Sequence, residues 1–170
     1  MTPYPYDSTN AMNERDKVRV IGIDPGLQRT GYAVVEKRGN DFLIITSGLL
    51  TTKKTSVSKK LLSIFNRIIN IIEDHSPSCL AVEAGFYSKN VDSLVKMSQV
   101  KGVVMLAASK KGLEVFEYSP TAVKSAIVGR GRAAKEQVRY MVEQMINKEI
   151  KGSFDISDAI AVAICHLQSS

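Results

Sequence analysis

Residues 18–31, which read VRVIGIDPGLQRTG, constrain the fold more than any other stretch of the chain. A run of β-branched residues leads to one carboxylate, Asp24, and stops at once on Pro25 and Gly26, as a buried strand does when it ends in a turn. Taken alone, an Asp-Pro-Gly sequence is often a turn whose Asp side chain accepts hydrogen bonds from the following amides. Because an unpaired carboxylate is costly to bury, Asp24 needs solvent, a cation or a partner at this strand end.

The length, cysteine content and net charge of the chain limit the classes of protein to which it can belong. Its 170 residues fit one domain of ordinary size, and no apolar run is long enough to cross a bilayer. Cys79 and Cys165 lie in apolar segments without ligand spacing, which argues against a disulfide framework or a zinc site and suits the cytoplasm. The net charge of +6 gives a modest indication of a polyanionic partner. We therefore expect a cytoplasmic protein without a membrane partner.

Hydrophobic periodicity predicts an α/β domain over residues 18–170, preceded by a polar, flexible extension over residues 1–17. Three strands joined by short turns, over 18–24, 30–36 and 42–50, indicate an antiparallel meander. A helix over 56–75 leads to a strand over 79–83, which should lie parallel to its neighbour in the sheet. The remaining pattern predicts a helix over 91–111, a strand over 113–118, and helices from 119, from about 133 and over 154–167.

Glu83 ends the strand over 79–83 in the same way that Asp24 ends the first strand. If these two strands are parallel neighbours, both carboxylates lie at the same edge of the sheet. Counting by twos places Gly22 on the face of Asp24 and Ala81 on the face of Glu83. Small residues at these positions would let another element approach the two carboxylates closely.

Two more carboxylates open the last predicted helix. Asp155 and Asp158 are three residues apart and therefore project from one face of its first turn. Acidic residues also suit a helix N-terminus through the dipole, so this pair alone does not require a cation. His166, near the far end of the same helix, fits a packing residue better than a ligand.

The loop after Glu83 carries two neighbouring rings, Phe86 and Tyr87, beside the charge of Lys89. The rings either fold into the core or stay exposed to stack on a base, as aromatic side chains do in proteins that distort nucleic acid.

Residues 124–135, KSAIVGRGRAAK, form the most basic and glycine-rich stretch. Gly129 and Gly131 free the backbone to approach a ligand, and the helix that follows offers unpaired amides to a phosphate. A solvated basic turn is the alternative, and the strand context and sequence of a P-loop are absent. The charged members of the stretch are Lys124, Arg130, Arg132 and Lys135.

Taken together, GIDPG at 22–26 with TGY at 30–32, Glu83 followed by Phe86, GRGRAAKEQV at 129–138 and DISDA at 155–159 resemble the RuvC family of bacterial Holliday junction resolvases. The resemblance covers residues 18–167. It implies a ribonuclease-H-like fold, in which helices flank a five-stranded mixed sheet of order 3-2-1-4-5. It also implies a crossover junction endodeoxyribonuclease, which resolves junctions in DNA recombination and repair by paired symmetric nicks that leave 5′-phosphate ends.

The resemblance carries functional roles onto individual residues. It implies that the metal-binding, catalytic carboxylates are Asp24, Glu83, Asp155 and Asp158, with two Mg²⁺ ions, or Mn²⁺, in each active site. The DNA-binding residues that we expect are Phe86, which stacks at the opened junction, Lys124 and Lys135 near the cut, and, as further contacts, Tyr87, Lys89, Arg130 and Arg132. The implied partners are a four-way DNA junction, a second copy of the chain and the RuvA–RuvB branch-migration complex.

Two other functions fit the same residues. A nuclease of this fold could act on RNA or on replication intermediates instead, because the four carboxylates do not distinguish these substrates. A non-catalytic junction-binding protein could keep the fold, although a pure binder has little use for clustered negative charges facing DNA phosphates.

Overall fold

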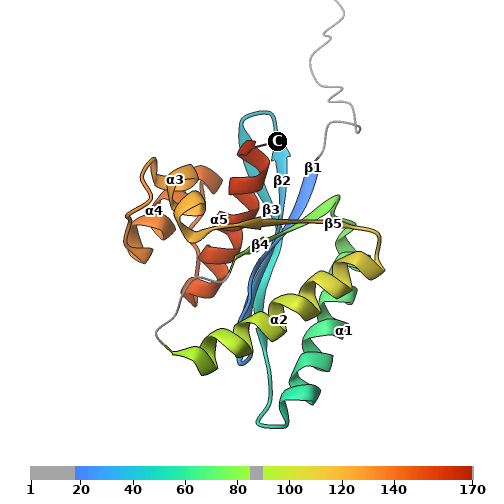
Figure 1. Ribbon diagram of the computed structural model, residues 1–170. Helices are drawn as coiled ribbons and strands as arrows, with labels where there is room; N and C mark the ends of the chain where they lie inside the picture. The colour runs from blue at the N-terminus through green and yellow to red at the C-terminus, as the bar shows by residue number, and fades with distance from the viewer. Residues whose placement is uncertain (1–17, 85–89, 170) are drawn as a thin grey trace, which may run out of the picture.

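The computed structural model describes residues 18–84 and 90–169, and its centre is a five-stranded sheet of order β3-β2-β1-β4-β5 (Figure 1). This sheet order is the predicted one. The strands are β1 (Val18–Asp24), β2 (Arg29–Arg38), β3 (Asp41–Thr51), β4 (Cys79–Glu83) and β5 (Glu114–Tyr118). The helices are α1 (Val57–His75), α2 (Val91–Lys110), α3 (Pro120–Val128), α4 (Lys135–Ile146) and α5 (Phe154–Ser169).

Strand register fixes where the first two carboxylates lie. β1, β2 and β3 form an antiparallel meander, whereas β4 lies parallel to β1 and to β5. In the β1–β4 pair, Ile23 is opposite Val82. Because the next residues along these parallel strands are Asp24 and Glu83, both carboxylates sit at the carboxyl edge of the sheet, as predicted.

Helices cover both faces of the sheet (Figure 1). Alternate strand residues such as Val20 and Ala81 pack against α3, α4 and α5, and the residues between them, such as Ile21 and Leu80, pack against α1 and α2. This alternation follows from the period of two in a strand. None of the helices within residues 18–84 and 90–169 is long and apolar enough to cross a membrane.

α5 lies directly on the backbones of β1 and β2, at two glycines. A Cβ atom on Gly22 would lie 2.2 Å from the carbonyl oxygen of Ala159, and one on Gly31 would lie 1.9 Å from that of Asp155. Any side chain at these positions would push the helix away from the sheet. The close approach of another element that we predicted at Gly22 therefore occurs. Gly31 allows the first turn of α5 to lie equally close to β2, the strand that follows Asp24.

The glycines of the basic stretch have structural roles. Gly129 has a φ of 78° and ends α3, since its amide donates to the Ser125 carbonyl. Gly131 packs so tightly that a Cβ there would lie 2.5 Å from Cγ2 of Thr121. α4 begins at Lys135 rather than at Ala133, because Ala134 is still extended. Both cysteines are buried and free.

Candidate active site

The candidate active site is built from three elements that meet at the carboxyl edge of the sheet. β1 contributes Asp24, β4 contributes Glu83, and the first turn of α5 contributes Asp155 and Asp158. All four side chains are half-buried. The fold thus brings these predicted carboxylates to one region of the molecule.

The turn after Asp24 is held by Thr30 rather than by Asp24 itself. The Thr30 hydroxyl donates a 2.7 Å hydrogen bond to the Gly26 carbonyl, and Thr30 is fully buried. Because Thr30 closes this turn, the structure does not require Asp24 as a turn-capping residue.

A pocket of about 160 Å³ opens at this edge. Its charged lining consists of Asp24, Glu83, Asp158, Lys124 and Lys135, and its remaining lining residues are Pro120, Val123, Val138 and Ala161. Two of the predicted DNA-binding lysines therefore share a pocket with three of the predicted carboxylates.

Burial and mutual repulsion perturb the carboxylates. Burial, followed by the negative charges of Asp158, Glu83 and Asp155, raises the pKa of Asp24 to about 8. Burial also raises the pKa of Glu83, with a further contribution from Asp158 and opposition from Lys135. A carboxylate held among like charges keeps its proton at neutral pH unless cations are brought to it.

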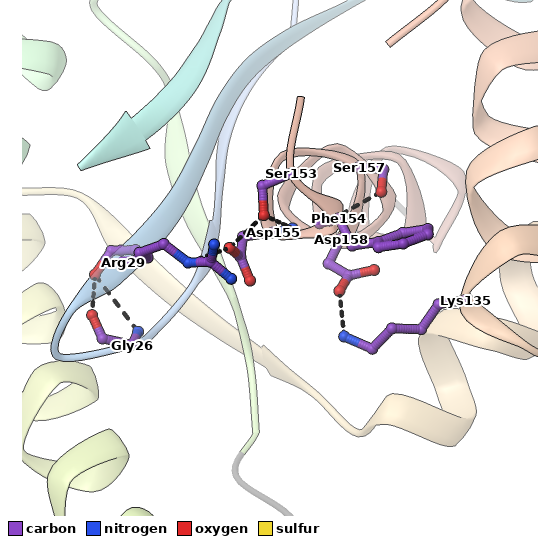
Figure 2. A network of polar contacts seen from close by, with 9 residues as sticks. Gly26, Arg29, Lys135, Ser153, Phe154, Asp155, Ser157 and Asp158 are labelled. Atoms are coloured by element: carbon purple, nitrogen blue, oxygen red, sulfur yellow. Dashed lines mark hydrogen bonds and ion pairs between the residues drawn. The ribbon is translucent and has the colours of Figure 1, made fainter. Parts of the chain in front are cut away.

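Two basic side chains already neutralise part of this acidic cluster (Figure 2). Lys135 Nζ lies 2.9 Å from Oδ2 of Asp158, and Arg29 Nε lies 3.2 Å from Oδ2 of Asp155. Burial lowers the pKa of Lys135, but its hydrogen bond to Asp158 outweighs this effect, so its pKa is raised overall. The two cations hold the acidic pair of α5 from opposite sides.

The donor set suits a hard divalent cation. It consists of carboxylate oxygens without thiolate or imidazole, a combination that favours Mg²⁺ or Mn²⁺ over zinc. Burial and the three neighbouring carboxylates raise the pKa of Asp24, and a bound cation would oppose both effects. Within residues 18–84 and 90–169, however, no group of three or more His, Cys, Asp or Glu side chains is gathered tightly enough to hold a metal ion as arranged. One physical reason is that Asp158 and Asp155 direct their carboxylate oxygens to Lys135 and Arg29 in ion pairs.

Sequence patterns did not identify Arg29 or Ser153 as parts of this region. Ser153 donates a 2.6 Å hydrogen bond to the same Asp155 oxygen that faces Arg29. A serine two residues before an acidic helix start is a weak signal for such a contact. Arg29 carries no comparable signal, because its position depends on how α5 meets β2.

The other predicted site residues either lie apart from the pocket or fall outside the residues that the structure describes. Arg130 and Arg132 are exposed on the α3–α4 connection and are not among the lining residues. The predicted stacking and loop residues Phe86, Tyr87 and Lys89 lie outside the described residues.

His166 packs at the opposite end of α5, as expected. Its Nδ1 lies 2.7 Å from the Tyr118 hydroxyl and its Nε2 lies 3.2 Å from Sγ of Cys79. Burial lowers the pKa of His166, although Glu114 opposes this effect. The imidazole is therefore a buried, hydrogen-bonded packing group remote from the carboxylates.

Comparison with known proteins gives consistent matches along most of the chain. The family model described as "Crossover junction endodeoxyribonuclease RuvC" matches residues 20–166. Proteins of that description from Halothermothrix orenii and Caldanaerobacter subterraneus are 41% and 42% identical to this chain. The first match covers 86% of this chain and 90% of the relative, and the second covers 90% and 94%.

Solved structures show the same similarity. The structure titled "T. thermophilus RuvC in complex with Holliday junction substrate" superposes with a TM-score of 0.83 at 30% identity, covering 88% of this chain and 93% of that one. The yeast mitochondrial Holliday junction resolvase Ydc2 gives a TM-score of 0.63 at 12% identity over 87% of this chain and 78% of its own, which shows a shared fold.

Proposed function

Because the chain belongs to the RuvC family of crossover junction endodeoxyribonucleases, it is a Holliday junction resolvase, and we propose that the acidic cluster at the carboxyl edge of its sheet is the active site. The catalytic residues in this proposal are Asp24, Glu83, Asp155 and Asp158. The observation that carries it is the pocket that brings Asp24, Glu83 and Asp158 together at this edge, where burial and the neighbouring carboxylates also raise the pKa of Asp24 to about 8. Such a cluster attracts cations and is poorly suited to any purely structural role.

The four carboxylates would hold two divalent cations, Mg²⁺ or Mn²⁺. Bound there, such ions would activate water for in-line attack on a phosphodiester and would stabilise the leaving 3′ oxygen. The contribution of the chain is to bring oxygen donors to one edge of the sheet, because β1 and β4 carry Asp24 and Glu83 there and the first turn of α5 carries the other two. Hydrolysis breaks the bond between phosphorus and the 3′ oxygen, which leaves 5′-phosphate and 3′-hydroxyl ends.

Lys135 and Lys124 are the residues best placed to meet the scissile strand. Both line the pocket of the carboxylates, and the Lys135 side chain is 62% exposed while it pairs with Asp158. In our proposal, the Lys135 ammonium turns from Asp158 to a phosphate oxygen when DNA enters, which would leave the Asp158 carboxylate available to hold a cation. Arg130 and Arg132 would contact the backbone farther from the cut, because they are exposed outside the pocket.

The loop after Glu83 would supply the stacking contact. Phe86 is the proposed ring at the opened junction, with Tyr87 and Lys89 as further contacts, because all three follow the proposed catalytic Glu83 within six residues of the sequence. Aromatic wedges of this kind stabilise unstacked bases in bent or opened DNA.

Paired nicks require two active sites, so we propose a two-fold homodimer. A stripe along α2 supports this proposal: Val91, Val95 and Leu106 are 69%, 49% and 61% exposed. Their spacing places them on one helix face with Gly102, where a Cβ atom would meet nothing within 4 Å among the described residues beyond the neighbouring backbone of α2 itself. Exposed apolar side chains around a glycine suit close packing of two helices. The RuvA–RuvB complex is the further partner that we propose.

Cleavage of a mobile synthetic four-way junction tests the proposal most directly. Each strand is labelled separately and incubated with the protein in Mg²⁺, in Mn²⁺ or in a chelator. We expect symmetric pairs of nicks that DNA ligase reseals, and only with a divalent cation. Binding without nicks would favour a non-catalytic junction-binding protein, and equal cutting of a four-way junction, a DNA duplex and an RNA–DNA hybrid would favour a nuclease of broader substrate range.

A further inference from the structure

The segment that joins β3 to α1 carries a concentration of positive charge that the proposed active site does not use. Residues 42–72 contain five basic side chains and no Asp or Glu. Lys53, Lys54 and Lys59 are exposed, and we call these three residues the β3–α1 basic surface. The other two basic residues are Lys60, which is half-buried, and Arg67.

This surface lies at the same edge of the sheet as the carboxylates. β3 is antiparallel to β2, which is antiparallel to β1, so β3 ends at the edge where Asp24 lies (Figure 1). Thr52 fastens the segment to the turn after Asp24, since its amide donates to the Gln28 carbonyl at 3.1 Å and its hydroxyl to the Leu27 carbonyl at 2.8 Å. The basic surface is therefore held in place relative to the active site.

These lysines differ from those on the neighbouring helix. On α2 and just after it, Lys96 pairs with Asp92, Lys101 with Glu117 and Lys111 with Glu73. Among the described residues, by contrast, none of the lysines of the β3–α1 basic surface forms an ion pair. Its positive charge is therefore available to an external anion.

The active site thus lies between two basic regions. Lys124, Arg130 and Arg132 follow β5, at one end of the strand order, and the β3–α1 basic surface follows β3, at the other end. A polyanion that crosses the edge of the sheet above Asp24 meets positive charge on both sides. Arg29, which is exposed and pairs with Asp155, lies at the start of β2, between the carboxylates and this second region.

We propose that the β3–α1 basic surface binds the phosphate backbone of a duplex arm of the junction, on the side of the active site away from the α3–α4 connection. The inference rests on the proposed function, because it uses the scissile strand at the carboxylates as its reference point. We favour DNA over an acidic protein as the ligand of this surface, because the surface lies at the same edge of the sheet as the carboxylates at which the strand is cut. Lysine side chains suit phosphates, which need charge but no particular side-chain geometry.

The test compares two double variants that remove equal charge. Lys53→Gln/Lys54→Gln removes two of the three positive charges of the β3–α1 basic surface. Lys110→Gln/Lys111→Gln removes those of two exposed lysines at the end of α2, on the opposite edge of the sheet. Binding of a four-way junction is measured in a chelator over a range of salt concentrations. This readout is independent of cleavage and of metal binding.

We expect the first variant to weaken junction binding roughly five- to tenfold near 0.1 M salt and to reduce the slope of log K against log salt by about 1 to 2. The control variant should behave like the unmodified protein. Equal behaviour of both variants would overturn the proposal, and so would a change in oligomeric state with unchanged DNA affinity, which would assign the surface to a protein partner. If the unmodified protein neither binds nor cuts junctions, the proposed function itself fails.

Discussion

Lys135 Nζ lies 2.9 Å from Oδ2 of Asp158, so a lysine at the start of α4 neutralises a carboxylate at the start of α5. The same ammonium group lowers the pKa of Asp24, against the burial and the like charges that raise it. It also opposes the rise in the pKa of Glu83, so one side chain acts on three of the proposed catalytic carboxylates. In the absence of DNA, it takes the place of part of the positive charge that the cluster requires.

Replacing Lys135 should impair cutting more than binding. We expect Lys135→Ala to reduce the single-turnover cleavage rate of bound junction by about 10²-fold, because it removes a charged group at the scissile phosphate. Lys135→Arg should retain part of the rate. Junction affinity measured in a chelator separates the two effects, and a loss of affinity with unchanged single-turnover cleavage would contradict the role given to Lys135.

Asp24→Asn should separate activity from stability. Cleavage should fall below detection because a proposed metal ligand is lost, whereas junction binding in a chelator should stay within about twofold of the unmodified protein. Without metal, the variant should be more stable by about 1 kcal/mol or more, because folding no longer has to bury or protonate a carboxylate among three others. Thermal unfolding in a chelator measures this gain. Normal cleavage by the variant would remove Asp24 from the catalytic set.

Gly31→Ala should displace the acidic end of α5. The added Cβ would lie 1.9 Å from the Asp155 carbonyl oxygen, so the helix must move away from β2. We expect a loss of about 1–3 kcal/mol in the free energy of unfolding, together with a large fall in cleavage. Denaturant unfolding and single-turnover cleavage check both effects. A stable variant of full activity would mean that α5 tolerates the shift without moving its carboxylates.

Glu36 should make the fold sensitive to acid. It is fully buried between Arg19, at 2.7 Å, and Arg38, at 2.6 Å. Burial would raise its pKa, but hydrogen bonds from the two arginines outweigh burial and lower it below the ordinary value of 4.5. Because the folded pKa is the lower one, the stabilisation is present above about pH 4.5 and is lost as the pH falls through the folded pKa.

Glu36→Gln tests this linkage. At pH 7 the variant should be about 2–3 kcal/mol less stable, since two arginines lose their carboxylate partner. Below about pH 4.5 its stability should approach that of the unmodified protein, as urea titrations across this range would show. A constant difference at all pH values would exclude Glu36 as the acid-sensitive group.

The exposed stripe on α2 makes a separate prediction about assembly. Leu106→Glu places a charge in the proposed dimer interface while leaving the monomer core untouched, because Leu106 is 61% exposed. We expect the dissociation constant of the dimer to rise by about 10-fold or more and paired nicks to become single, uncoupled nicks. Sedimentation and strand-specific cleavage report the two changes. A dimer of unchanged strength would place the interface elsewhere.

Local patterns predicted the elements well, because each strand and helix carries its own periodicity. The strand that ends at Glu83 and the helix that begins at Phe154 start where predicted. Local patterns could not predict the order of the strands in the sheet, because strand pairing depends on contacts between distant segments. Only the resemblance to a known family predicted that order. Once β4 lies parallel to β1 and beside it, the ends of the two strands place Asp24 and Glu83 at the same edge of the sheet.

The ion pairs of the site could not be predicted in this way. Arg29 meets Asp155 because α5 rests on Gly31, a contact between segments that are far apart in the sequence. The sequence shows that Lys135 is charged, but the ion pair that it forms with Asp158 depends on how α4 packs against α5. Sequence patterns thus identify which residues bear charge, whereas three-dimensional packing decides which charges neutralise one another.

The position of α5 in the chain has a consequence for biosynthesis. Most of this helix is buried, and it packs on β1 and β2, which are synthesised long before it. One apolar face of the nascent sheet therefore has no cover from α5 until residues 154–169 have been synthesised. We expect chains that stop before Phe154 to aggregate or to be held by chaperones.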